Sequence, residues 1–286
     1  MAFTDIYYDS PDGLRLHARD YAGAGGVPVL CLAGLTRNAR DFELLAERLA
    51  PSRRVIVAEQ RGRGGSAYDP KPENYHPGTY AADMMVLLDH LGLGKVGIIG
   101  TSLGGLMAMI MAASWPDRFS GILLNDVGPE VAAEGIEKIR LYIDRVPKVT
   151  DWREAADELS TLFAAAFPDY QPADWARFAR QVYREGAGGT PVLDYDANIA
   201  VNVKNGGTAA PDLWPVFDAL PQIPVAVIRG GLSNILSAAT LAEMRKRRPE
   251  LLSVELPRVG HAPDLGEPAS LALIDDFLAE IDRGTR

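Results

Sequence analysis

The sequence predicts an α/β fold, in which a mostly parallel central sheet carries helices on both faces and is interrupted by a helical cap insertion. Short apolar segments alternate with segments of helical periodicity over the first 128 residues, and this alternation returns after residue 213. Between them, residues 130–213 contain helical patterns and no convincing strand. We therefore expect one core formed by residues 1–128 and 214–286, with residues 129–213 as a helical cap.

The expected elements follow one another as short strands and helices. The first two strands alternate in polarity around Pro11-Asp12-Gly13, which is typical of a hairpin. Val27–Ala33 is nearly all apolar, as expected for a strand covered on both faces. Apolar residues at helical spacing, such as Phe42, Leu45 and Leu49, indicate the helices. Strands are expected at 6–9, 14–21, 27–33, 54–58, 96–100, 119–125, 225–229 and 252–256, and helices at 40–49, 80–91, 103–114, 238–247 and 269–281.

The composition is that of an ordinary globular protein and excludes several functional classes. The chain has 286 residues, of which 47% are hydrophobic and 23% charged, so it can bury a large core without a disulfide or metal. A net charge of −9 argues against a nucleic-acid-binding protein, which would need a basic surface. The basic cluster Arg245–Arg248 is short and typical of a solvated helix end.

The cysteine content and the chain start bear on location. The single cysteine, Cys31, excludes an intrachain disulfide and lies in an apolar run, which indicates a buried side chain. Met1–Ser10 shows no basic segment followed by an apolar one, so no secretory signal is visible. We expect a soluble, cytoplasmic protein with no membrane partner, and the oligomeric state stays open.

The segment Gly100-Thr101-Ser102-Leu103-Gly104 has the pattern G-x-S-x-G. An apolar strand runs directly into it, and a helix without charged residues follows it. Small residues on both sides of the serine allow a sharp turn, which projects the Ser102 hydroxyl from the carboxyl edge of the sheet. We therefore predict that Ser102 is a nucleophile; the alternative is a purely structural Gly-Ser turn.

A serine needs a base to remove its proton, and the chain has four histidines. His261 follows the last predicted strand, in a loop where secondary structure gives no reason for an imidazole. It also comes after Ser102 in the chain, as this type of triad requires. We predict His261 as the base, against the alternative of a surface histidine.

With these motifs, the chain resembles the α/β-hydrolase family over essentially its whole length. The resemblance implies a backbone oxyanion hole formed by the N–H groups of Leu35 and Leu103, although Ala33 stands where similar sequences often carry histidine. The turn Gln60–Ser66 is similar to a turn of the family, and we interpret it as structural. No His, Cys or Asp cluster has metal-ligand spacing, and dinucleotide and phosphate-binding glycine motifs are absent, so we expect no metal and no cofactor.

The third member of the triad departs from the family pattern. Similar sequences carry an aspartate after the strand 225–229, where this chain has Asn234. An asparagine cannot orient the imidazole, and such a change costs about 10⁴ in kcat. Some family members take the acid from the preceding strand, where Asp126 lies. Our hypothesis is that Asp126 is the acid; the alternative is that Asn234 marks an impaired member.

The predicted cap is rich in aromatic residues, which favours a mainly apolar pocket for a small-molecule substrate. Many of these residues also have to form the core of the cap itself. They are Tyr142, Trp152, Phe163, Phe167, Tyr170, Trp175, Phe178 and Tyr183. Arg37, near the oxyanion loop, either meets a substrate carboxylate or is solvated, and we favour solvation.

The leading hypothesis is a serine hydrolase that cleaves a carboxylic ester or lactone of moderate size through an acyl-enzyme. One alternative within the same fold is hydrolysis of a C–C bond in a diketone or ring-fission product. Another is a ligand-binding member whose catalysis is impaired by Asn234.

Overall fold

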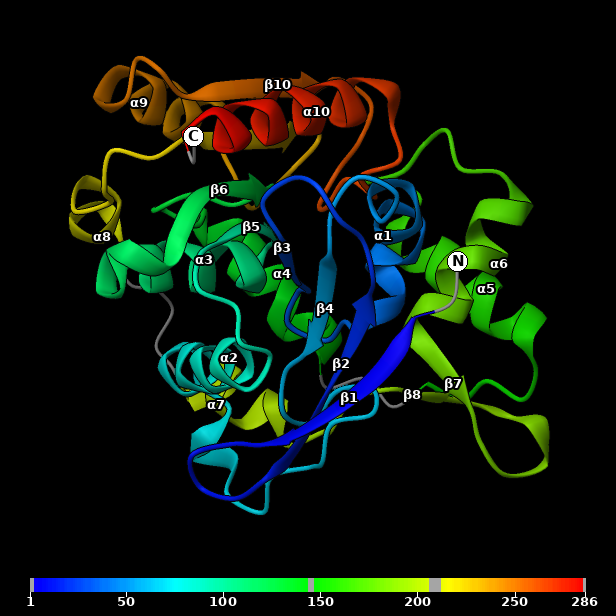
Figure 1. The fold of residues 1–286 in the computed structure, drawn as a ribbon. Helices are drawn as coiled ribbons and strands as arrows, with labels where there is room; N and C mark the ends of the chain where they lie inside the picture. The colour runs from blue at the N-terminus through cyan, green and yellow to red at the C-terminus, as the bar shows by residue number, and fades with distance from the viewer. Residues whose placement is uncertain (1–2, 144–146, 206–211, 285–286) are drawn as a thin grey trace.

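The computed structural model describes residues 3–143, 147–205 and 212–284 of the chain. Its centre is an eight-stranded sheet with the order β1-β2-β4-β3-β5-β6-β9-β10 (Figure 1). The strands are β1 (Thr4–Asp9), β2 (Arg15–Tyr21), β3 (Val29–Leu32), β4 (Val55–Glu59), β5 (Val96–Thr101), β6 (Phe119–Asn125), β9 (Val225–Gly230) and β10 (Leu252–Leu256). β2 pairs antiparallel with β1 and β4, and the remaining pairs are parallel, which confirms the predicted fold class.

The central strands are buried on both faces, as their continuous apolar sequences predict. In β3, Leu30 and Leu32 pack into one hydrophobic cluster, and Val29 and Cys31 pack into another on the opposite face. This alternation follows from the two-residue repeat of an extended strand. Burial raises the pKa of the Cys31 thiol, which therefore stays protonated in the core.

Helices cover both faces of the sheet (Figure 1). Apolar residues of α1 (Glu43–Leu49) and α10 (Pro268–Arg283) pack on one face. The other face carries α2 (Pro77–His90), α3 (Leu103–Ser114), α8 (Trp214–Asp218) and α9 (Ala238–Arg247). Short 3₁₀ turns occupy Ala39–Phe42, Pro72–Asn74, Pro116–Arg118 and Ala187–Gly189. Within the described ranges, no helix combines the length and the apolar character needed to cross a bilayer.

Strands β1, β2 and β4, the first three in the sheet order, are joined by an ionic cluster around the buried His17 of β2. Its Nδ1 lies 2.7 Å from Glu59 Oε2, and its Nε2 lies 2.8 Å from Asp5 Oδ1. Burial alone would lower the pKa of His17, but the hydrogen bonds and charges of these two carboxylates outweigh burial and raise it. Glu59 also accepts hydrogen bonds from the backbone N–H groups of Ala39 and Gly65, so the cluster fixes the loops after β3 and β4.

A long segment is inserted between β6 and β9. Its elements are α4 (Ala133–Ile143), α5 (Trp152–Phe163), α6 (Pro172–Val182), β7 (Tyr183–Glu185), β8 (Pro191–Leu193) and α7 (Ile199–Asn205). α5 and α6 share a small core that includes Leu159, Phe167 and Trp175. The expectation that this segment lacks strands is wrong, because β7 and β8 form an antiparallel pair. Three-residue strands are too short to show alternation in a sequence.

Two arginine-rich segments differ in their roles. Arg61 and Arg63, in the turn after β4, are both fully buried; Arg61 is paired with Asp69 and Asp83. This agrees with a structural role for the turn. In the basic cluster 245–248, however, Arg248 is not solvated: it is buried and donates to the carbonyl oxygens of residues 220 and 221.

Candidate active site

Ser102 lies in a sharp turn between β5 and α3, and its backbone φ is +54°. The glycines of the G-x-S-x-G pattern allow this turn to pack against its neighbours. A Cβ atom on Gly100 would lie 2.3 Å from the carbonyl oxygen of Gly104, and one on Gly104 would lie 2.0 Å from that of Leu32. The pattern is thus required by the close approach of the helix to the two strands, and this strained turn presents the serine.

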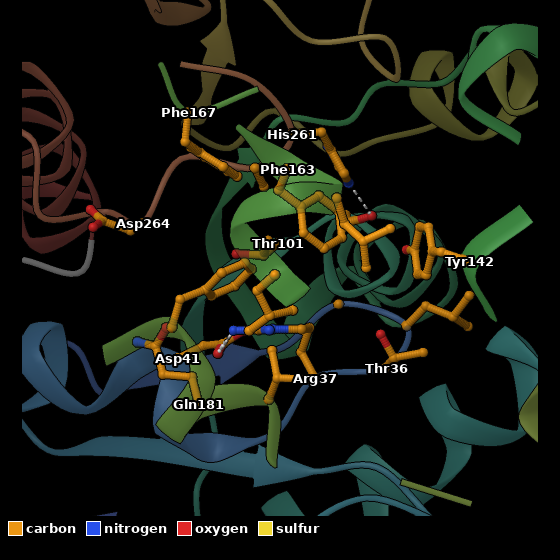
Figure 2. Close-up of a pocket in the computed structure, with 18 of the residues that line it drawn as sticks. Thr36, Arg37, Asp41, Thr101, Tyr142, Phe163, Phe167, Gln181, His261 and Asp264 are labelled. Carbon is orange, nitrogen blue, oxygen red and sulfur yellow. Dashed lines mark hydrogen bonds and ion pairs between the residues drawn. The ribbon is translucent and has the colours of Figure 1, made fainter. Parts of the chain in front are cut away.

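The structure brings Ser102, His261 and Asp126 together in one hydrogen-bonded row. His261 Nε2 lies 2.9 Å from Ser102 Oγ (Figure 2), and His261 Nδ1 lies 2.7 Å from Asp126 Oδ2. The three residues follow β5, β10 and β6, so they gather where parallel strands end at the same edge of the sheet. The spatial meeting of positions 102 and 261, expected from the sequence, is found.

Asp126 occupies the acid position of this row. It is completely buried, and its second oxygen, Oδ1, accepts a hydrogen bond of 2.8 Å from the Gly230 N–H. Asn234 lies in the loop after β9, where its carbonyl oxygen packs against Gly135 of α4. Both nitrogens of His261 are occupied by Ser102 and Asp126. Of the two candidate acid positions, the structure therefore places Asp126, and not Asn234, on the imidazole.

The two predicted oxyanion-hole residues flank the serine. Leu103 is the first residue of α3, so its N–H has no carbonyl partner within its own helix. Gly34 lies against Ser102, since a Cβ atom on it would be 3.7 Å from the serine Cβ, and Leu35 follows directly. Arg63 donates two hydrogen bonds, of 2.9 and 2.6 Å, to the Leu35 carbonyl oxygen. This buried arginine fixes the peptide that follows Leu35 and thereby the loop.

Asn125 is a positioning residue that the sequence analysis missed. It is completely buried, and its Nδ2 donates to Thr101 Oγ1 at 3.0 Å and to the Pro263 carbonyl oxygen at 2.9 Å. These bonds join the serine turn to the histidine loop. An amide at the end of a buried apolar strand, directly before Asp126, is the signal that could have identified it.

The inserted segment contacts the histidine loop as well. The Gly260 N–H donates a 2.6 Å hydrogen bond to the Ala166 carbonyl oxygen. A Cβ atom on Gly260 would lie only 2.5 Å from the Ala166 Cβ. The residue before His261 is therefore a glycine because the inserted segment passes directly over it.

A pocket opens beside Ser102 and His261 (Figure 2). Aromatic side chains of the inserted segment form much of its wall, namely Tyr142, Phe163, Phe167, Tyr170, Phe178, Tyr183 and Tyr195. Burial raises the pKa of Tyr142 to about 12, so this phenol is neutral and protonated at physiological pH. In the described part of the chain, no group of three or more His, Cys, Asp or Glu side chains could hold a metal ion. The wall is thus mainly apolar with a few polar groups.

Arg37 pairs with a carboxylate of its own chain. Its Nε and Nη2 donate to the two carboxylate oxygens of Asp41, at 2.8 and 2.5 Å (Figure 2). The guanidinium also lies over the Phe178 ring, 4.7 Å from its centre. The favoured expectation of a solvated Arg37 is wrong, because its side chain is only 17% exposed. Arg37 precedes the 3₁₀ turn Ala39–Phe42 that carries Asp41, so helical periodicity could not predict this pair.

Comparison with known proteins agrees with this fold. The sequence model of the α/β hydrolase fold matches residues 27–267, and the chain belongs to the α/β-hydrolase family. The crystal structure of an α/β hydrolase from Novosphingobium aromaticivorans superposes with a TM-score of 0.93 at 46% identity, covering 98% of this chain and 99% of that one. A 3-hydroxybutyrate-oligomer hydrolase from Cupriavidus necator is 34% identical over 94% of each chain. A 2-(acetamidomethylene)succinate hydrolase from Mesorhizobium japonicum is 29% identical over 93% of this chain and 92% of that one.

Proposed function

We propose that this protein is a serine hydrolase that cleaves a carboxylic ester or lactone through an acyl-enzyme. The observation that carries the proposal is the hydrogen-bonded row of Ser102, His261 and Asp126 beside a mainly apolar pocket. The similarity to a 3-hydroxybutyrate-oligomer hydrolase supports ester bonds as the target.

In the first half of the reaction, Ser102 Oγ attacks the carbonyl carbon and His261 Nε2 accepts its proton. Asp126 holds the Nδ1 proton of the imidazole and stabilises the imidazolium that forms. The N–H groups of Leu35 and Leu103 stabilise the oxyanion, each by about 3 kcal/mol. His261 then gives the proton to the leaving alkoxide, and the acyl group stays on Ser102.

In the second half, water attacks the acyl carbon while His261 again acts as the base. Collapse of the second tetrahedral intermediate releases the carboxylic acid and restores Ser102. The cycle uses one water for each ester bond and needs no cofactor.

The inserted segment has its own place in this proposal. Residues 129–213 act as a cap over a core formed by residues 1–128 and 214–286. The supporting observations are the aromatic wall that the segment contributes to the pocket and its contact with the histidine loop through Ala166. The cap therefore selects the substrate, whereas the core carries the chemistry.

Labelling with a fluorophosphonate probe tests the nucleophile, and release of p-nitrophenol from esters of increasing chain length tests the reaction. We expect rapid labelling of the wild type and none of Ser102→Ala, with ester turnover lost in the same variant. A series of lactones in the same screen tests the second type of proposed substrate, and a diketone tests the alternative of C–C bond hydrolysis. A folded wild-type sample that neither reacts with the probe nor cleaves any ester would refute the proposal in favour of a ligand-binding role.

A further inference from the structure

The charged groups of the pocket suggest which esters it accepts. Among the described residues that line it, Arg37 is the one permanently cationic side chain, and three carboxylates accompany it. They are Asp41, Glu158 and Asp264. Arg37 is therefore not a lone cation in this wall, as it would be if its charge were there to attract an anion.

Asp41 already occupies the face of Arg37 that recognises carboxylates. The Nε–Nη2 edge of a guanidinium matches the two oxygens of a carboxylate, and here Asp41 binds this edge with both oxygens. Phe178 covers a flat face of the same guanidinium. An anionic substrate group at this place would either have to displace Asp41 or lie beside its like charge.

The other two carboxylates have partners of their own. Glu158 Oε2 accepts a 2.7 Å hydrogen bond from the Tyr183 hydroxyl. Asp264 is paired with Arg177 at 3.3 Å and lies at a more exposed place, so its charge is partly offset. Asp41 is thus the carboxylate that decides whether Arg37 can attract an anion.

We propose that the Arg37–Asp41 ion pair determines specificity: it makes the pocket select esters whose acyl group is uncharged and exclude those whose acyl group ends in a carboxylate. The inference rests on the ester hydrolysis proposed for Ser102. It assigns a substrate class, neutral acyl esters, and a residue, Asp41, whose removal changes that class.

Two esters of nearly equal size and shape, one anionic and one neutral, test the effect of charge alone. Monoethyl glutarate ends in a carboxylate, and ethyl 4-carbamoylbutanoate has an amide at the same place. We expect the wild type to favour the amide ester in kcat/KM by about tenfold or more, as like-charge repulsion in a partly buried site predicts. Asp41→Asn frees Arg37 and raises the acid-to-amide ratio of kcat/KM by about tenfold, mainly through KM and less strongly at high salt.

The opposite variant and a matched control make the test specific. Arg37→Gln leaves Asp41 without its partner cation and lowers the acid-to-amide ratio further, so the two variants shift the ratio in opposite directions. Glu43→Gln also removes one acidic charge in the next helix, but away from the pocket lining, and leaves the ratio unchanged. Turnover of the amide ester in each variant shows that the site is folded.

Binding measurements keep the inference separate from the proposed reaction. In the Ser102→Ala background, calorimetry gives the Kd of both esters with and without Asp41→Asn, independently of turnover. If the wild type cleaves no ester and does not react with the probe, but Asp41→Asn still improves binding of the anionic ester, selection by charge at the ion pair stands and the proposed function fails. If the wild type favours the anionic ester, or if Asp41→Asn leaves both the kcat/KM ratio and the Kd ratio unchanged, the inference is overturned.

Discussion

Replacement of Asp126 by asparagine should abolish nearly all activity while leaving the fold intact. The reason lies in the two hydrogen bonds of the carboxylate. Oδ1 accepts from the Gly230 N–H, and Oδ2 lies on His261 Nδ1. In Asp126→Asn, the carbonyl oxygen of the amide is held by Gly230, so the NH₂ group faces Nδ1 and donates to it. The proton of a neutral imidazole then moves to Nε2, which can no longer accept the Ser102 proton.

The magnitude follows from this change of tautomer. A triad whose acid is replaced by its amide loses about 10⁴ in kcat, or about 5.5 kcal/mol of transition-state stabilisation. The wrong tautomer affects the chemical step and not the pocket wall, so KM should change little. Steady-state kinetics on the best p-nitrophenyl ester measures kcat and KM, and the thermal unfolding midpoint tests whether the fold is retained.

Two more variants complete this experiment. One is Asn234→Asp alone, and the other combines Asn234→Asp with Asp126→Asn. Because both imidazole nitrogens are already occupied, Asn234→Asp should leave kcat unchanged in the wild-type background. An active Asp126→Asn variant, or activity that appears only once position 234 is acidic, would refute the reasoning and place the acid after β9.

Two further predictions concern the architecture around the site. Gly104→Ala should destabilise the protein by about 3 kcal/mol, because the added Cβ would lie 2.0 Å from the Leu32 carbonyl oxygen. Gly94→Ala is the control, because no atom lies within 4 Å of the Cβ that it adds. Urea unfolding compares the two, and equal stability would contradict the packing argument. The raised folded-state pKa of His17 means that its protonation stabilises the fold fully below pH 6.5, and that this contribution is lost as the pH rises through the folded-state pKa. The destabilisation caused by His17→Gln should therefore be largest in acid and shrink in alkali, and a pH-independent loss in unfolding experiments would argue against the ionic cluster.

Much of the core could be predicted because local and global signals agree there. The bounds expected for α3, β6, α9 and β10 are those observed, since apolar runs and helical spacing end at clear turn residues. The serine turn and its histidine follow from motif and chain order. The preference for Asp126 over Asn234 rested on the inability of an amide to replace the acid and on the resemblance to family members that take the acid from that strand.

The remaining features depend on tertiary contacts that leave little trace in the chain. The β7–β8 pair consists of two three-residue strands, which have no room for a repeat. Arg248 belongs to a basic cluster, yet its guanidinium meets buried carbonyl oxygens from a distant turn. Arg37 lies outside any helix, so its pairing with Asp41 left no periodic signal, and the role of the pair depends on the pocket wall that other segments supply.

The close passage of Ala166 over Gly260 limits how the family can diversify. Exchanging the inserted segment for that of a relative would bring a new backbone against the peptide that precedes the imidazole, and any bulkier side chain at position 166 would push that peptide aside. Under the proposed function, the segment that selects the substrate also positions the loop of the base, so chimeric enzymes built by swapping this segment should need matching changes in that loop.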